Sequence, residues 1–372
     1  MYLASSSAVV FGGASGWGKR VHDTLQHVVR NTQIIEIDAS HQQIGEAIES
    51  SQIIFLAIPD DAIKDLLIDT ENLFAKDKIV IDCATNKIEF EKTLRQIAVS
   101  GPSVCSTHPM VSPKNSPNGH NVLIMPVGNN SDAAEAAAKE IYTAMGMNIV
   151  DFDFDRHGDA MVILQMVPHL VDRILIDAIA EGMSHRAMRI EDLSKLAPAN
   201  YLLSELGLGR VATQRPDVSA GIIATGLRQA FGQQILDRIQ STLDRIKCLS
   251  DNRKELTELF KESLGHLDPS AEWRAEMEAK TEAALTRLEN LRSRHFVVEA
   301  PNERGILRNI LSILNDNHMI DLTALDSQII QAPDGSRIAR FEIGVTDEYV
   351  DIEKLSSDLG SIGVKIVEFS KM

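Results

Sequence analysis

A glycine-rich turn between an apolar strand and a helical segment constrains the start of this chain more than any other feature. The run AVVF at residues 8–11 breaks directly into GGASGWGKR, and apolar residues then recur at helical spacing. On the G-x-G-x-x-G template the three key positions are Gly13, Ser15 and Gly18, so serine replaces the middle glycine. Strand, glycine turn and helix in this order predict a dinucleotide-binding βαβ unit, with the pyrophosphate at the helix N-terminus.

Further residues complete the expected cofactor site. Gly16 and Trp17 lie inside the turn, and Gly12 and Gly16 could supply the close backbone approach that Ser15 does not. Asp38, at the end of the second expected strand, is placed to bind the adenosine ribose, and Glu36 is a second candidate. An acid at this position favours NAD over NADP. The alternative is a glycine-rich turn that binds nothing.

Strands and helices alternate through the first 154 residues, with expected strands at 32–38, 52–59 and 78–85. This rhythm predicts a Rossmann-type α/β domain, a parallel sheet with helices on both faces. Residues 155–293 show only helical periodicity, which predicts an all-helical substrate and dimerisation domain. Residues 294–372 follow the order β-α-β-β-α-β, the ferredoxin-like pattern.

The composition limits the class of protein and its partners. The chain has 372 residues and a formal charge of −16, so nucleic acid and anionic membranes are not expected partners, although an anionic small molecule remains compatible. Three cysteines without C-x-x-C spacing, Cys83, Cys105 and Cys248, are typical of a reducing compartment. With no signal-peptide pattern, no long apolar run and no metal-binding pattern, we expect a soluble cytoplasmic protein without a metal site.

Polar residues follow three of the expected strands. Pro59 and Asp60 follow IIFLAI, Thr85 and Lys87 follow IVIDCA, and His108 follows SVCST. Ligands of doubly wound sheets bind beyond the carboxyl ends of the strands, so these residues should surround the nicotinamide and the substrate. A histidine is suited to remove a hydroxyl proton near neutral pH.

Structural explanations stand beside these functional ones. Lys87 could equally be a solvated lysine at a helix start, and His108 could be a histidine that is merely hydrogen-bonded in a loop. His120, in the same loop but away from a strand end, is assigned no function.

Three short motifs carry a resemblance that covers essentially the whole chain. STHPM after the nucleotide domain, DCATNK, and LQMVPHL in the helical segment resemble the prephenate and arogenate dehydrogenase family, as does the domain order with a C-terminal ACT-like domain. The resemblance implies NAD-dependent oxidative decarboxylation of prephenate to 4-hydroxyphenylpyruvate, a step of tyrosine biosynthesis, by a homodimer.

The resemblance also implies roles for individual residues. His108 would assist deprotonation of the C4 hydroxyl, and Thr85 would orient it. Lys87 would lie near the substrate and His169 would contact it, while Arg210 would bind a substrate carboxylate, a role that suits the guanidinium fork.

Departures from the family pattern leave alternatives open. Val111 and Ser112 replace the aromatic-glycine pair after H-P-M, so arogenate or 4-amino-4-deoxyprephenate is an alternative substrate. A non-catalytic amino-acid sensor is a second alternative, and a 3-hydroxyacid-type dehydrogenase a weaker third. In the ACT-like domain the resemblance places an aromatic amino-acid effector at Gly305. Met319 replaces the next family glycine, so a purely structural or dimerising ACT-like domain is also open.

Overall fold

The computed structural model describes residues 3–186, 188–190, 196, 198–267, 269–292, 295–331, 336–345 and 350–369. These residues form two compact units. The first comprises Met1–Arg173 and Gln214–Arg245, and the second Ile174–Thr213 and Ile246–Met372. The helical region is thus shared between the two units, and the division into three domains at 154/155 and 293/294 stays a prediction.

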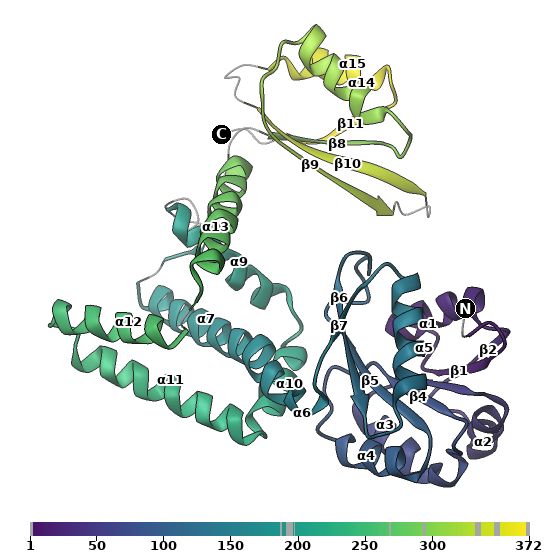
Figure 1. Cartoon of the computed structure of the whole chain (residues 1–372). Coiled ribbons are helices and arrows are strands. Elements are labelled where there is room, and N and C mark those ends of the chain that lie inside the picture. Colours follow the sequence, from purple (N-terminus) through teal and green to yellow (C-terminus); the bar gives the residue numbers. More distant parts are fainter. Residues whose placement is uncertain are drawn as a thin grey trace. The chain divides into compact units, whose positions relative to one another are not determined.

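The first unit is built on a seven-stranded sheet in the order β2-β1-β3-β4-β5-β6-β7 (Figure 1). Its strands are β1 (Ser7–Phe11), β2 (Asn31–Ile35), β3 (Ile53–Leu56), β4 (Ile79–Asp82), β5 (Ser103–Pro109), β6 (Asn121–Val127) and β7 (Asn148–Asp151). The helices between them are α1 (Gly16–Val28), α2 (His41–Ser50), α3 (Asp60–Asp69), α4 (Glu91–Ser100) and α5 (Asp132–Ala144), with a short 3-10 turn at Glu71–Leu73. The Rossmann-like arrangement predicted from the alternation is therefore present.

The prediction of a wholly parallel sheet is wrong at one edge. β1 to β5 run parallel, but β6 pairs antiparallel with β5, and β7 runs parallel to β6. Parallel neighbours need a long crossover, usually a helix, whereas β5 and β6 are joined directly by residues 110–120. Pro113 and Pro117 in this connection disfavour a helix, so the chain turns back beside β5.

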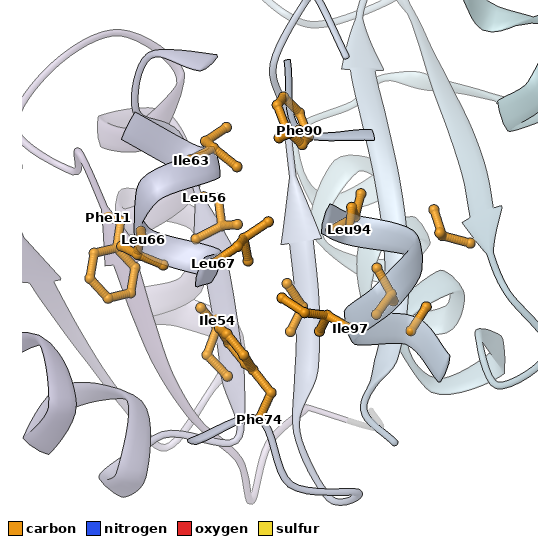
Figure 2. Packing of buried hydrophobic residues seen from close by; sticks show 14 of the residues in the cluster. Phe11, Ile54, Leu56, Ile63, Leu66, Leu67, Phe74, Phe90, Leu94 and Ile97 are labelled. Atoms are coloured by element: carbon orange, nitrogen blue, oxygen red, sulfur yellow. The ribbon is translucent and has the colours of Figure 1, made fainter. Parts of the chain in front are cut away.

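Both faces of this sheet are buried, each under its own hydrophobic cluster. Successive side chains of a strand point to opposite faces, so each strand contributes alternate residues to the two clusters. Val9 and Phe11 of β1 contribute to one core cluster, and Ala8 and Val10 to the other. Figure 2 shows the first cluster, where Leu66 and Leu67 of α3 and Leu94 and Ile97 of α4 pack beside Ile54 and Leu56 of β3. The second cluster contains residues of α1 and α5. Helices on both faces are confirmed.

The rest of the first unit is helical. α6 (Phe154–Met161) continues through a π-helical turn (Val162–Met166) into α7 (Val167–Arg186), and α10 (Pro216–Leu227) and α11 (Ala230–Cys248) follow. The first unit contains α7 up to Arg173 and α11 up to Arg245, and the remainder of each helix belongs to the second unit. Pro168 is the second residue of α7 and directly follows the π-helical turn. Because proline offers no N–H to the preceding turn, the regular α-helical ladder is interrupted there.

The second unit combines helices with an antiparallel sheet. α9 (Ala199–Thr213), α12 (Arg253–Leu267) and α13 (Ala271–Arg292) precede β8 (His295–Pro301), α14 (Ile306–Ser312), a π-helical turn (Ile313–Asn317), β9 (Leu322–Gln331), β10 (Arg337–Val345), α15 (Ile352–Gly360) and β11 (Lys365–Phe369). The strand order β11-β8-β10-β9 and the order of elements are those of the predicted ferredoxin-like pattern. Within the described residues of both units, no helix is long and apolar enough to span a membrane.

Candidate active site

The glycine turn brings α1 close against β1. Gly12 and Gly16 have positive φ angles of 80° and 56°, which favour glycine. A Cβ atom on Gly18 would overlap the carbonyl oxygen of Gly12, and one on Gly13 would overlap the side chain of Ile34. The turn therefore needs glycine at both outer positions of the fingerprint, for close packing as well as for a ligand.

The N-terminus of α1 is suited to an anion. Ser15 is the N-cap residue, but its side chain makes no capping hydrogen bond, and residues 14–16 are exposed. The first N–H groups of this helix can therefore face a pyrophosphate. Trp17 is half-buried against the core beside α1, so its indole acts in packing.

Of the two candidate acids, Glu36 lies nearer to the turn. β2 ends at Ile35, three residues earlier than the expected strand, so Asp38 lies in an exposed turn beyond it. The Glu36 carboxylate accepts a hydrogen bond of 2.9 Å from the backbone N–H of Ala14. These residues fit a dinucleotide: a glycine cradle that Cβ atoms would fill, a helix N-terminus, and an acid at the end of β2. Pro59 is the exposed N-cap residue of α3 at the same edge.

The connection after His108 is held against α1. Arg20 donates from Nε to the carbonyl oxygen of Pro113 at 2.7 Å and from Nη2 to that of Asn115 at 2.8 Å. Val111 is half-buried against the core beside α1, so this departure from the family pattern has a packing role. The segment that contains Val111 and Ser112, where the sequence departs from the motif it resembles, thus runs beside α1 and its glycine turn.

A buried ion pair lies at the end of β4. The Lys87 ammonium contacts the Asp82 carboxylate, and both side chains are buried. Lys87 also donates to the carbonyl oxygen of Thr107 at 2.9 Å, which ties the end of β4 to β5. Lys87 is therefore a fixed charge in the interior, and the solvated helix-start lysine considered above is excluded.

His108 is buried beside a second histidine. Its Nδ1 lies 3.1 Å from Nε2 of His157, which is on α6, and the two rings meet edge to face. Both rings are almost fully buried, at 3% and 2% exposure. Thr85, the expected partner of His108, is exposed, and the hydrogen bond at Nδ1 goes to His157 instead. The proposed orientation of His108 by Thr85 stays a prediction without a contact to support it.

Burial keeps both imidazoles neutral. Burial lowers the pKa of His108 well below its ordinary value, and the nearby charge of Lys87 and the ring of His157 add to the effect. Burial and Lys87 together lower the pKa of His157 to about 3. Neutral imidazoles carry a free lone pair at neutral pH, so the pair can accept a proton.

A cavity of about 400 Å³ lies at this edge of the sheet. It is lined from the sheet side by Asp60, Thr85, Asn86 and Lys87, and from the helical side by residues of α6, the π-helical turn and α10, among them His157 and Gln165. Burial raises the pKa of Asp60 to about 6, against the opposing effects of Lys87 and a hydrogen bond from Asn86. The volume suits a small molecule.

The two remaining predicted residues, His169 and Arg210, are not among the residues that line this cavity. His169 on α7 is buried, and its Nδ1 lies 3.3 Å from the hydroxyl of Ser219 on α10, which Arg173 also contacts. Arg210 is an exposed residue of α9, in the second unit. The structure brings His108, Lys87 and Thr85 to one edge of the first unit, and the roles of His169 and Arg210 stay predictions.

Sequence reasoning missed His157. It lies outside the three motifs, and only its helical spacing singles it out: Phe154 and Met161, three residues before and four after, are buried on the same face of α6. A histidine between two core positions of a helix signals a buried imidazole, but its partner on β5 follows only from the fold.

Comparison with known proteins finds a family model that matches the first part of the chain. Residues 20–150 match the family model described as prephenate dehydrogenase, nucleotide-binding domain. A search of curated protein sequences finds no match.

Three solved structures have a similar fold. Prephenate dehydrogenase from A. aeolicus, in complex with hydroxyphenyl propionate and NAD+, is 15% identical, with a TM-score of 0.50 over 72% of this chain and 99% of that chain. Synechocystis arogenate dehydrogenase is 18% identical, with a TM-score of 0.50 over 70% and 99%. A putative prephenate dehydrogenase from Corynebacterium glutamicum is 13% identical, with a TM-score of 0.53 over 75% and 97%. Residues 20–150 are thus similar to the nucleotide-binding domain of prephenate dehydrogenases, and the three solved structures share the fold of this chain.

Proposed function

We propose that this protein is an NAD-dependent dehydrogenase that converts prephenate to 4-hydroxyphenylpyruvate with loss of carbon dioxide. The single observation that carries the proposal is the neutral histidine pair at the sheet edge shared by the glycine turn, with His157 in the wall of the cavity. A dehydrogenase acting on a ring hydroxyl needs a proton acceptor beside a nicotinamide site, and this edge provides both.

Each step rests on residues of this chain. A dinucleotide held by the glycine turn and Glu36 would supply the hydride acceptor for the hydroxyl-bearing carbon of the ring. His108 accepts the hydroxyl proton, since burial keeps its imidazole neutral at pH 7. Loss of the ring carboxylate then yields the aromatic ring, and the cavity, partly enclosed by α6 and α10, limits the water around the reacting atoms. Glu36 at the end of β2 disfavours a 2′-phosphate and supports NAD over NADP.

The charge of the cavity supports a second substrate class. Five carboxylates line it, against one lysine that already contacts Asp82. They are Asp60, Glu91, Asp155, Asp159 and Asp217. Glu91 and Asp155 are paired with Arg95, and Asp217 is paired with Arg215, so the acidic character of the cavity rests on Asp60 and Asp159. These two carboxylates favour a substrate that carries an ammonium group, so arogenate or 4-amino-4-deoxyprephenate is the second candidate.

A substrate panel separates these candidates. Purified protein is mixed with NAD or NADP and each of the three substrates, and nicotinamide reduction is followed by absorbance. We expect reduction with NAD and prephenate, and a loss of at least about 10²-fold in His108→Asn. His120→Asn, an exposed change in the same loop, is the matched control and should keep full activity.

The other outcomes decide between the alternatives. Turnover only with an amine-bearing substrate would replace prephenate by the second candidate. No turnover with any substrate would support the amino-acid sensor. Homodimer formation, cytoplasmic location and binding of an aromatic amino acid at Gly305 remain predictions, which sedimentation, cell fractionation and calorimetric titration with tyrosine and phenylalanine would test.

A further inference from the structure

The contact at Nδ1 of His108 determines which of its nitrogens can serve a ligand. Nδ1 lies at hydrogen-bond distance from Nε2 of His157, so Nε2 of His108 is the nitrogen left for a hydroxyl proton. For Nε2 to be an acceptor in a neutral ring, Nδ1 must carry the hydrogen and donate it to His157. His157 then keeps its own hydrogen on Nδ1.

We propose that His157 orients His108 in this tautomer by accepting the hydrogen of its Nδ1, which keeps Nε2 of His108 available to the ligand's hydroxyl. The proposal rests on the proposed function, in which His108 is the proton acceptor. His157 is thus a positioning residue for His108, the part that the family resemblance gives to Thr85.

Burial and the ammonium of Lys87 disfavour a positive charge on either ring. The two imidazoles therefore meet as neutral groups, and one ring must donate its hydrogen to the other.

The tautomer can be observed without any substrate. In protein labelled with ¹⁵N-histidine, two-bond ¹H–¹⁵N correlation spectra distinguish the two neutral tautomers, and the His108→Asn variant identifies the His108 signals. We expect Nδ1–H on His108 at pH 7.5. An Nε2–H tautomer in the unaltered protein would overturn the proposal, whatever the substrate panel shows.

Kinetics separate positioning from a merely structural role. With the substrate that the panel identifies, His157→Asn should lower kcat by about 10- to 100-fold and leave KM within about twofold. Thr85→Ala should lower kcat by less than about threefold. A greater loss in Thr85→Ala than in His157→Asn would contradict the positioning role of His157.

Discussion

The two sheets of this protein differ in how many of their faces are buried. β3, β4 and β5 are buried at every residue, because helices cover both faces of the first sheet. In the second sheet, Phe341 and Ile343 of β10 pack in the core cluster that includes residues of α14 and α15. Arg340 and Glu342, which alternate with them, lie on the other face and pair with Glu299 and His295.

This difference explains where buried charge can be held. A strand buried on both faces can end in polar groups shielded from water, as Asp82, Lys87 and His108 are. There the charges interact strongly, shift the pKa values of their neighbours and can serve chemistry. On the charged face of the second sheet, solvent screens similar pairs, so each contributes little to stability.

Removing the cation of the buried ion pair should produce the largest difference between the two units in the free energy of unfolding. Lys87→Met leaves the Asp82 carboxylate buried without its cation, and we expect the free energy of unfolding of the first unit to fall by about 3–5 kcal/mol. The matched change in the second sheet, Arg340→Met, should cost less than about 1 kcal/mol.

The two tryptophans allow each unit to be followed by itself. Trp17 lies in the first unit and Trp273 in the second, so Trp273→Phe and Trp17→Phe backgrounds report the two urea transitions by fluorescence. Equal losses in both units would show that the buried pair is no more stabilising than a surface pair, and the contrast between the sheets would fail.

Substitution of one glycine in each unit should sharpen the contrast. Gly12→Ala combines a φ of 80° with a Cβ atom 2.5 Å from the carbonyl oxygen of Ala57, so we expect a loss of about 2–3 kcal/mol and weaker NADH binding. Gly305→Ala has a φ of 92° but open space around its Cβ, so it should cost only about 1 kcal/mol. The same unfolding curves and an NADH fluorescence titration measure both effects.

Acid should destabilise the first unit through its neutral histidines. The pKa of His157 is about 3 in the folded chain and about 6.5 when unfolded, so the unfolded state binds more protons between these values. Stability is therefore complete above pH 6.5 and falls as the pH drops toward 3, by about 2 kcal/mol at pH 5 from His157 alone. His108 adds to this loss in the same direction.

A variant isolates this histidine in the pH dependence. His157→Gln removes the titrating ring, so its unfolding free energy should change less between pH 7.5 and pH 5 than that of the unaltered protein. Asp60, half-exposed and with a raised pKa, acts in the opposite direction and offsets part of the loss in both proteins. The same pH slope in both proteins would exclude a buried neutral His157.

Much of the architecture follows from local patterns in the sequence. Alternating strands and helices, the glycine turn and the β-α-β-β-α-β order specified both sheets, because side-chain periodicity and glycine conformations are local properties. The sequence also contains the signal for a direct β5–β6 connection, because two prolines and no helical segment lie between these strands. The expectation of a parallel strand there overlooked this signal.

The sequence by itself determined that His108, Thr85 and Lys87 follow strands that end at one edge of a parallel sheet. Only the tertiary structure decided their partners: Lys87 with Asp82, and His108 with His157 rather than Thr85. It also placed Glu36, and not Asp38, against the cofactor turn. The physical reason is that strand ends follow from periodicity along the chain. The partner of a buried polar group depends instead on which distant helix packs over the sheet, and here α6 supplies His157 from 49 residues further along.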